Sequence, residues 1–568
     1  MIGGQQLAAR RRRRDRLATV LITSAGFAVM ALLLLMLGYL LHTALPLAAA
    51  PRIDEPRVSA AAATAALPAD ARAAGERPQL RRDGRLRCGD DGPWWPLPGL
   101  RGEPRLLALA EGGGTLLLTD TLGTLYRYGI AAPGDCRPQR LGEARPQPFV
   151  ARALLAEARR PVAFLIAAGG RLRVLQSLTG EVLYDGVLPG AEGASRFALD
   201  AAGTLLSARR GEQLLRWRIH NPYPETGIAA LWQAQWYPGY PAPAQVWHPD
   251  GEAAGTLSKY GLTPLLFGTF KAALCGMLIA VPLALGAAIY TGYFLSRRQR
   301  NRIKPAVELL EAFPTVVLGF LAGLWLAPLL ADHLVQVVLV PLLLVLLPLL
   351  LALAHLLLQY LSPRFILRPP RASILVLAYL LALPALWWAG PGIEALFFDG
   401  SLRDSLLRAA GLRYEQRNAL LVGLAMGVAL VPTLFSIVED AVFAVPRELS
   451  DGSLALGATR WQSLSRVVLP AASPAILSAM LIGLGRGLGE TMIVLLATGN
   501  TPIMEYSPLL GLRSLSASLA TELPEAAVGS TQFRVLFLAA LVLFALTFVL
   551  NTVAELFRQQ LRYRYAGR

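Results

Sequence analysis

The sequence predicts a multi-pass α-helical membrane protein that carries a separate β-rich soluble domain. Of its 568 residues, 54% are hydrophobic and only 16% are charged, a composition typical of a membrane protein with a soluble appendage. The apolar residues gather into about eight runs that are long enough to cross a bilayer. The net charge of +16 comes mostly from arginines beside these runs, which indicates membrane orientation rather than nucleic-acid binding.

The first apolar run follows a basic N-terminus. Residues 10–14 are an unbroken run of arginines, and residues 17–42 are largely apolar. We therefore predict a cytoplasmic N-terminus over residues 1–16 and a transmembrane anchor over residues 17–43. A cleaved signal peptide is the alternative, because Leu-Ala-Ala-Ala-Pro follows at residues 47–51. The anchor is favoured because the apolar run exceeds the roughly 7–15 residues of a signal core.

Residues 44–260 are too many for a loop between two spans, and we predict a β-rich, propeller-like domain there. Residues 60–81 are rich in alanine, proline and arginine and are interpreted as a linker. After them, a strand, a glycine-containing turn and a second strand recur at residues 113–128, 169–185 and 202–217. This length leaves room for only about three or four blades. A β-sandwich is the alternative.

The remaining apolar runs predict a transmembrane domain over residues 261–568. They lie at residues 262–295, 307–330, 334–361, 372–391, 418–445, 474–499 and 533–556. Basic clusters occur at residues 297–304, 364–371, 447–466 and 558–564. With about eight spans and a cytoplasmic N-terminus, these clusters and the C-terminus all fall in the cytoplasm. Residues 44–260, 392–417 and 500–532 then face the periplasm, although the arginines of 392–417 weaken the pattern.

Two cysteines, Cys88 and Cys136, lie in the predicted periplasmic domain. Disulfides persist in that compartment, so the two residues are a candidate disulfide that the sequence leaves undecided. The third cysteine, Cys275, lies in an apolar run and is interpreted as a packing residue.

The sequence predicts no metal site, no cofactor and no nucleotide site. Its five histidines are scattered without metal-ligand spacing. None of its lysines, Lys259, Lys271 and Lys304, follows a glycine, so the phosphate-binding Gly-Lys-Ser/Thr of a P-loop is absent from the sequence. The chain is therefore predicted not to be an ATPase of that kind.

A polar segment at residues 446–472 separates two of the spans. Gly457 is followed by nine residues and then by Val467-Val-Leu-Pro470. This spacing resembles the coupling loop of ABC-importer permeases: Glu-Ala-Ala, three residues, Gly, nine residues, Ile-x-Leu-Pro. The opening triplet is here Asp451-Gly-Ser453, which keeps only the acid. We expect a short helix, a bend at the glycine and a second helix ended by the proline. An ordinary cytosolic loop is the alternative.

Two further stretches carry a family resemblance. Glu308-Leu-Leu-Glu-Ala-Phe-Pro-Thr-Val-Val-Leu-Gly319 resembles Glu-Leu-Leu-Ala-x-x-Pro-Ser-x-Val-x-Gly. Gly483-Leu-Gly-Arg-Gly-Leu-Gly-Glu-Thr-Met492 resembles Gly-x-Gly-Arg-x-x-Gly-Glu-Thr-Met. Both patterns belong to the permease subunits of the phosphate-specific ABC importer. The 44–260 domain and a leucine-rich helical hairpin at residues 334–391 are additions to the usual six-span subunit of that family.

The resemblance implies a type I ABC-importer permease core that imports inorganic phosphate across the bacterial inner membrane by ATP-driven alternating access. The partners it implies are a paralogous second permease, two cytosolic ATPase subunits and a periplasmic phosphate-binding protein. The match at residues 308–319 favours the first of the two paralogous permeases. The residues expected to couple to the ATPase are Asp451, Gly457, Ala458, Leu469 and Pro470.

Arg486 lies deep in an apolar run, and Glu490 follows it by four residues. Charged residues inside a membrane usually face a bundle interior or a water-filled path. At this spacing the two side chains are expected to pair on one helix face, with Arg486 offering its guanidinium to a passing oxyanion. We therefore predict Arg486, Glu490 and Thr491 as substrate-pathway residues. A salt bridge that only holds two helices together is the alternative.

Two other functions stay open at this point. One is import of another oxyanion, such as sulfate or molybdate, against which the Arg-Gly-Leu-Gly-Glu-Thr-Met string argues. The other is a membrane-anchored sensor or scaffold, which the size of the 44–260 domain favours. The complete coupling-loop spacing disfavours a sensor, because a sensor needs no ATPase-docking segment.

Overall fold

Two compact units make up the chain. The computed structural model describes residues 2–60, 78–88, 92–110, 114–132, 135–157, 159–200, 202–249, 257–361 and 372–566. One unit contains Met1–Pro264 and Thr521–Val542, and the other contains Leu265–Ala520 and Leu543–Arg568. Most of the predicted linker at residues 60–81 and all of the basic loop at residues 362–371 lie outside the described residues.

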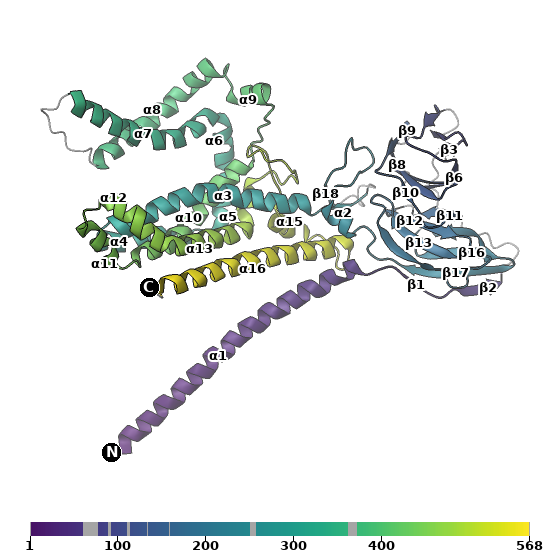
Figure 1. The fold of residues 1–568 in the computed structure, drawn as a ribbon, viewed down its shortest axis with the longest axis horizontal. Helices are drawn as coiled ribbons and strands as arrows, with labels where there is room; N and C mark the ends of the chain where they lie inside the picture. The colour runs from purple at the N-terminus through teal and green to yellow at the C-terminus, as the bar shows by residue number, and fades with distance from the viewer. Residues whose placement is uncertain are drawn as a thin grey trace. The chain divides into compact units, whose positions relative to one another are not determined.

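The β-rich domain of the first unit is built from antiparallel sheets (Figure 1). One sheet contains β11 (Ala151–Ala156), β12 (Val162–Ala167), β13 (Arg171–Gln176) and β14 (Val182–Val187). A second contains β6 (Pro104–Ala110), β7 (Thr115–Asp120), β8 (Thr124–Ala132), β9 (Asp135–Arg140) and β10 (Arg145–Pro146). A third contains β15 (Ser195–Leu199), β16 (Leu205–Arg210), β17 (Gln213–His220), β1 (Arg52–Ile53) and β2 (Arg57–Ala60). The smaller sheets are β3 (Pro78–Leu80), β4 (Arg85–Cys88) and β5 (Trp95–Pro96), and the pair β18 (Trp247–His248) and β19 (Lys259–Tyr260).

The larger sheets pack face to face. Side chains alternate between the two faces of each strand, so alternate residues of one strand contact different neighbouring sheets. In β7, Leu116 and Leu118 pack with residues of β4 and β8, whereas Leu117 packs with residues of β11, β12 and β13. In β12, Leu165 belongs to that same cluster, whereas Phe164 packs with residues of β16 and β17. The two central sheets are therefore buried on both faces, as are the blades of a propeller. This arrangement differs from the two sheets of the alternative β-sandwich.

The first strands of the domain complete the sheet that contains β15, β16 and β17. Ile53 of β1 lies opposite Ile219 of β17, and Val58 of β2 lies opposite Leu215 of the same strand. Backbone hydrogen bonds thus tie the start of the β-rich domain to β17, which lies far along the sequence.

The three recurring sequence stretches are hairpins, but one of them is out of phase. Residues 113–128 and 202–217 contain β7–β8 and β16–β17, the second and third strands of their sheets. Residues 169–185 contain β13–β14, the third and fourth strands of theirs. The hairpin equivalent to the other two is β12–β13. The predicted equivalence of residues 169–185 with the other two stretches was therefore wrong by one strand. Every hairpin of such a sheet has the same strand–turn–strand pattern, so the sequence does not show which pair of strands is equivalent.

Seven helices of the described residues are long and apolar enough to cross a membrane, or up to eight if a bent pair counts as one span. They are formed by α1 (Ile2–Ala44), α3 (Thr263–Ile289) with η4 (Tyr290–Phe294), α5 (Thr315–Leu321) with η6 (Ala322–Leu326) and α6 (Ala327–Asp332), the bent α7 (Leu334–Leu361), α8 (Ala372–Phe397) with α9 (Leu402–Ala410), α10 (Ala419–Phe443), α12 (Arg460–Ser463) with η7 (Leu464–Val468) and α13 (Leu469–Leu488), and α16 (Thr531–Ala566). The shorter helices are η1 (Leu45–Ala48), α2 (Ile228–Trp232), α4 (Arg297–Glu308), η5 (Leu309–Ala312), α11 (Arg447–Ala455), α14 (Met492–Ala497) and α15 (Leu515–Glu522). These helices follow the predicted apolar runs in the same order along the chain.

Three of the predicted spans have wrong boundaries. The span expected at residues 372–391 extends instead over Ile374–Ala410. The span expected at residues 474–499 runs instead over Arg460–Leu488. The span expected at residues 307–330 begins only at Thr315. Pro314 sets the start of the span at Thr315, because the residue before a proline is driven out of the helical region. Phe313 is accordingly extended, with φ −70° and ψ 126°.

Helices α3 and α10 approach closely in the second unit. A Cβ on Gly423 of α10 would lie 2.9 Å from the Cβ of Cys275, and one on Gly276 of α3 would lie 2.8 Å from the Sδ of Met426. Glycines at these contacts let the two helix backbones come together, as small residues do in membrane bundles. Cys275 is free and packs against this core, which confirms its interpretation as a packing residue.

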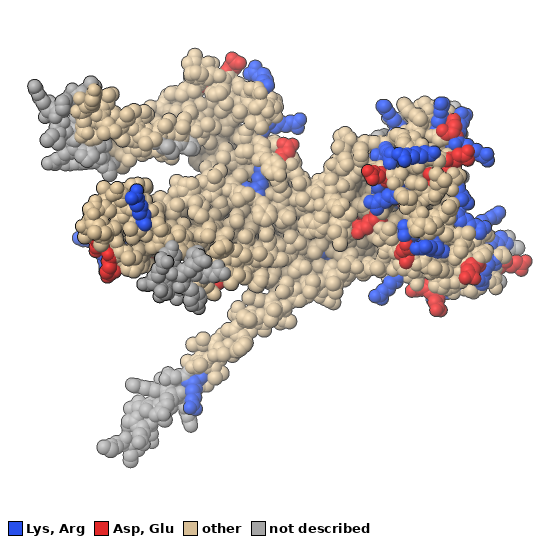
Figure 2. Space-filling model, viewed as in Figure 1, with Lys and Arg blue, Asp and Glu red and all other residues tan. Residues whose placement is uncertain are grey.

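Charged side chains are distributed unevenly between the two kinds of structure. Figure 2 shows many lysine, arginine, aspartate and glutamate side chains over the β-rich domain and few over the helices on the face it displays. Large apolar side chains such as Leu278 and Phe320 are instead exposed, at 77% and 59%. Exposed apolar surface on this scale is expected of helices that lie in lipid.

Candidate functional site

A row of polar side chains runs between the α4–η5 segment and α10. The capping box between Ser296 and Gln299 starts α4. Arg300, Lys304, Glu308 and Glu311 then follow at spacings of three or four residues, which place them on one helix face. Their partners on α10 appear in reverse order along the chain, so the two segments lie antiparallel.

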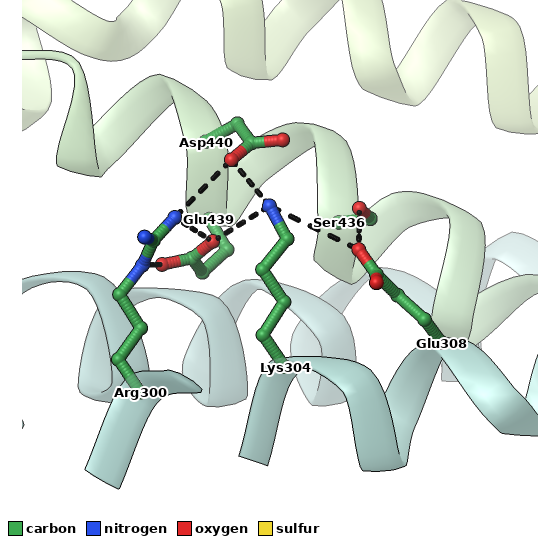
Figure 3. Close-up of polar contacts among 6 residues, drawn as sticks. All are labelled: Arg300, Lys304, Glu308, Ser436, Glu439 and Asp440. Atoms are coloured by element: carbon green, nitrogen blue, oxygen red, sulfur yellow. Dashed lines mark hydrogen bonds and ion pairs between the residues drawn. The ribbon is translucent and has the colours of Figure 1, made fainter. Parts of the chain in front are cut away.

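The first part of the row is a charge network around Glu439 (Figure 3). Glu439 is fully buried. Arg300 Nη2 lies 2.9 Å from Glu439 Oε2 and 3.2 Å from Asp440 Oδ1. Lys304 Nζ lies 3.2 Å from Glu439 Oε2 and also donates to Asp440. A buried carboxylate is tolerated when cations and hydrogen bonds satisfy it, so this network fixes α4 against α10.

The pKa values of the two cations reflect this pairing. Hydrogen bonding to Glu439 raises the pKa of Arg300 above its ordinary value, and burial opposes the rise only in part. For Lys304, burial disfavours the charge, but the hydrogen bonds to Asp440 and Glu439 outweigh it and raise the pKa. Both side chains therefore remain cationic at neutral pH.

The middle of the row is a hydrogen bond between a hydroxyl group and a carboxylate. Ser436 Oγ donates to Glu308 Oε1 at 2.8 Å, as Figure 3 also shows. Lys304 Nζ lies 3.9 Å from the same carboxylate oxygen. Glu308 thus connects the network around Glu439 with the next turn of α10.

The far end of the row brings in Arg486 from α13. Arg486 Nη1 donates to Glu311 Oε1 at 2.6 Å and also donates to Thr433 Oγ1. Thr433 Oγ1 in turn donates to Glu311 Oε1 at 2.9 Å. The hydrogen bond from Arg486, and then that from Thr433, hold the pKa of Glu311 below its usual range. Three separate segments of the second unit therefore meet at one cationic and one anionic group.

The predicted pairing of Arg486 with Glu490 is wrong. Helix α13 ends at Leu488, with Gly489 as its C-cap, so the i,i+4 spacing no longer describes a helix. Glu490 Oε1 instead accepts a hydrogen bond from the backbone N–H of Ile493 at 3.4 Å, at the start of α14. Thr491 Oγ1 donates to the carbonyl of Gly489 at 3.3 Å.

Sequence reasoning missed Glu311 and Thr433 as partners of Arg486. Glu311 stands inside the 308–319 stretch, three residues after Glu308 and next to a span. An acidic residue at the edge of a membrane span indicates that a cationic side chain pairs with it, but the sequence does not identify which of the distant cations this is. Thr433 gives no signal, because an isolated threonine in an apolar helix usually bonds its own backbone.

The segment at residues 446–472 has the predicted helix and glycine bend. Helix α11 covers Arg447–Ala455, and Gly457 follows with φ +90°, a conformation that favours glycine. Thr459 then caps α12 through a capping box with Gln462. Ser453 Oγ donates to Ser463 Oγ at 2.7 Å, which joins the two helices on either side of the bend.

The expectation that a proline ends the second helix of this segment is wrong. Leu469 and Pro470 lie at the start of α13, directly after the π-helical turn η7. Proline is tolerated in the first turn of a helix because its missing N–H and fixed φ suit that position. The widened turn before Pro470 thus lets one continuous helix run from the bend into the membrane span.

The tip of the bend exposes apolar side chains. Leu456 and Trp461 are 92% and 67% exposed, and Asp451 and Gly457 are exposed beside them. Ala458 is half-buried. An apolar tip with charged neighbours is typical of a surface that another protein covers.

The side chains of Cys88 and Cys136 lie outside the described part of the structure. Their backbones are described: Cys88 ends β4, and Cys136 is the second residue of β9. Strands β4 and β9 contact each other. The pairing of the two cysteines stays a prediction.

Comparison with known proteins identifies the helical part. The family described as "Binding-protein-dependent transport system inner membrane component" matches residues 280–563, half of the chain. The chain belongs to this family. It is a multi-pass transport permease and not an enzyme, and the family implies an ATPase and a substrate-binding protein as its partners.

Individual relatives cover the same region. The chain is 26% identical over 292 residues to the "Probable ABC transporter permease protein YqgH" of Bacillus subtilis, covering 51% of this chain and 69% of the relative. It is 28% identical over 309 residues to the "Phosphate transport system permease protein PstC 1" of Mycobacterium bovis, covering 54% and 74%. A solved structure of an amino acid ABC transporter covers 53% of this chain and 92% of that one, at 12% identity and a TM-score of 0.29.

Proposed function

We propose that this chain is the membrane-spanning permease subunit of an importer for inorganic phosphate. The relatives named as phosphate transport permeases support this substrate. The observation that carries the proposal is the environment of Arg486. Its described hydrogen bonds run through Nη1 alone, so the Nε–Nη2 edge has no partner among the described residues. That edge is the fork with which arginine binds oxyanions in bidentate geometry.

Glu311 takes over the part that was first expected of Glu490. It holds the guanidinium of Arg486 in place and, as a fixed counter-charge, keeps a bound anion from being held too tightly. Arg486 is 36% exposed and Glu311 is 43% exposed, so both groups remain accessible to an entering ligand. A partly balanced cation suits a transport site, which must bind its substrate and also release it.

ATP-driven motion enters through the bend around Gly457. The exposed tip at Leu456 and Trp461 would dock into a cleft of a cytosolic ATPase. Because α12, η7 and α13 form one continuous helix, movement of the docked tip reaches Arg486 near the end of the same helix. Asp451, Ala458, Leu469 and Pro470 belong to this coupling segment.

The full assembly would contain this chain, a paralogous second permease, two ATPase subunits and a periplasmic phosphate-binding protein. In the proposed orientation both termini and residues 446–472 are cytosolic, and residues 44–260 are periplasmic. The arginine distribution supports this orientation. The 334–391 hairpin and the β-rich domain are additions for which this function requires no role.

Growth of a phosphate-uptake-deficient strain tests the proposal. Expression of this chain together with its partner subunits should restore growth on limiting phosphate and uptake of labelled phosphate. Excess sulfate or molybdate should not compete with that uptake. Rescue of sulfate or molybdate uptake instead would assign another oxyanion. Correct insertion and assembly without uptake of any oxyanion would favour a sensor or scaffold.

A further inference from the structure

A cavity of about 550 Å³ lies wholly within the first unit. Its walls come from the β8–β10 region, the turn between β13 and β14, and the segment that contains α2. The apolar part of the lining is Leu141, Leu178, Ile228, Trp236 and Pro243. Its volume falls in the range of small-molecule sites, about 300–1,000 Å³.

Two arginines meet at one edge of this cavity. Arg127 is only 6% exposed and donates from Nη1 to the carbonyl of Leu178. Arg145 Nη1 donates to the carbonyl of Gly180 at 2.6 Å. A Cβ on Gly180 would lie 3.2 Å from Cζ of Arg127 and 3.3 Å from Nε of Arg145. The two guanidinium groups are therefore close neighbours over the Gly180 backbone.

The two cations lack a counter-ion within the described residues. Neither Arg127 nor Arg145 forms an ion pair with a described carboxylate. Burial, and then the charge of Arg145, lower the pKa of Arg127 to about 10, which still leaves it protonated at neutral pH. Two like charges held together in a partly buried site favour an anion between them.

A carboxylate with an unsatisfied oxygen borders the same cavity. Glu181 Oε2 is buried and has no hydrogen-bond partner among the described residues. A Cβ on Gly227 would overlap this oxygen, so the glycine leaves room for it. An unsatisfied buried acceptor is unfavourable, and a donor on a ligand would satisfy it. Glu143, an exposed carboxylate, also borders the cavity.

We propose that this cavity binds a small anion that also carries a hydrogen-bond donor, such as hydrogenphosphate or an α-amino acid. The anionic group binds Arg127 and Arg145, and the hydroxyl or ammonium group donates to Glu181 Oε2. An anion without a proton at neutral pH, such as sulfate, has no donor for Glu181 and is repelled by it. The site is separate from Arg486 and does not depend on the proposed import function.

Calorimetric titration of the full chain in detergent at pH 7 tests the proposal. The chain carries Arg486→Gln throughout, so that the proposed transport site does not contribute. Inorganic phosphate, L-leucine and sulfate are the three probes. Phosphate or L-leucine is expected to bind, and the one that binds identifies the source of the anion. Sulfate is expected to bind at least about tenfold more weakly, by the loss of one charged hydrogen bond.

Two variants assign the binding to this cavity. Arg145→Gln and Glu181→Gln should each weaken binding at least about tenfold. Arg145 is exposed, so its replacement is compatible with folding, and an unchanged melting temperature checks this. Arg216→Gln, at an exposed arginine of β17, is the matched control and should leave binding unchanged. Absence of binding by both phosphate and L-leucine, equal binding of sulfate, or full binding by both variants would overturn the proposal.

Discussion

Arg486 shows how one charged side chain inside a membrane helix can serve both packing and transport. Glu311 and Thr433 hold its Nη1, which is the arrangement expected of a salt bridge between segments. The opposite edge of the guanidinium has no described partner, which is the arrangement expected of a ligand site. These two interpretations differ in what removal of the charge does to assembly and to uptake.

Substitution of Arg486 separates the two interpretations. Arg486→Gln should lower phosphate uptake about 10- to 100-fold, because a charge-assisted bidentate contact is lost, while the complex still assembles and hydrolyses ATP. Arg486→Lys keeps the charge without the fork and should retain partial uptake. Labelled-phosphate uptake and co-purification of the subunits are the measurements. Normal uptake by Arg486→Gln, or loss of assembly as the only defect, would contradict the site assignment.

The acid that matters for Arg486 can be tested in parallel. Glu311→Gln and Glu490→Gln make the same chemical change at two acids. Because Glu311 and not Glu490 contacts Arg486, the first variant should change the apparent affinity for phosphate more than the second. An equal or larger effect of Glu490→Gln on affinity would show that the described contact is not the one used during transport.

Glu157 gives the β-rich domain a pH dependence. Its side chain is 2% exposed and pairs with Arg160 at 2.6 Å. Burial raises its pKa from 4.5 to about 7, although Arg160 opposes the shift. The folded domain therefore keeps Glu157 protonated where the unfolded chain ionises it. As the pH rises from about 4.5 to 7, this group removes up to about 3 kcal/mol of stability.

Hydrogen exchange measures this contribution in the full chain. Protection factors of β11 and β12 should fall across the range from pH 4.5 to 7. Glu157→Gln cannot ionise and should not show this part of the decline. Glu212→Gln, at an exposed position in the same domain, is the control and should behave like the unmodified chain. An identical pH profile for Glu157→Gln would contradict the shifted pKa.

At the scale of elements, the bend between α11 and α12 depends on one backbone conformation. Gly457 has φ +90°, and a Cβ there would meet no atom within 4 Å. The obstacle to a side chain is therefore backbone strain and not crowding. The same bend begins the continuous helix that ends close to Arg486, so a local change at Gly457 bears on the whole coupling element.

Gly457→Val should leave the protein inserted but uncouple ATP hydrolysis from uptake. A β-branched side chain at positive φ distorts the bend and costs about 1–3 kcal/mol. Gly286→Val is the matched control, because Gly286 lies within α3 outside the coupling segment, is exposed and has open space where a Cβ would stand. ATPase activity and phosphate uptake are measured in the same membranes. Normal phosphate uptake that stays coupled to ATP hydrolysis in Gly457→Val, at normal expression, would contradict the proposed docking of this bend on the ATPase.

At the scale of the whole molecule, the proposed orientation places the β-rich domain and α4 on opposite sides of the membrane. Glu212 and Arg298 are exposed positions in these two regions. A membrane-impermeant maleimide should label Glu212→Cys in spheroplasts, and should label Arg298→Cys only after the membrane is opened. The unmodified chain measures the background from the native thiols. Labelling of both positions from the same side would reject the orientation.

The periplasmic location also predicts a disulfide between Cys88 and Cys136. Strand β4 ends at Cys88 and contacts β9, in which Cys136 lies, so the two strands that carry the cysteines are neighbours. Mass spectrometry of alkylated protein should find these two thiols blocked before reduction and Cys275 free after denaturation. Cys88→Ser should lower the stability of the domain by about 2–4 kcal/mol. Free thiols at both positions in protein isolated without reductant would reject the pairing.

The sequence by itself determined the positions of most apolar spans, the glycine bend at residues 446–472 and the family resemblance. These features are local: a span depends on about 20 consecutive apolar residues, and the bend needs a residue that adopts positive φ, as Gly457 does. The tertiary structure decided which groups meet. The partner of Arg486 lies 175 residues away, in η5, and helix α13 stops before Glu490. Strand β17 pairs with β1 and β2 from the start of the domain. Local sequence patterns carry no information about such distant pairings, because many acids and many strands of similar pattern compete for each position. Only the packing of the whole chain selects one of them.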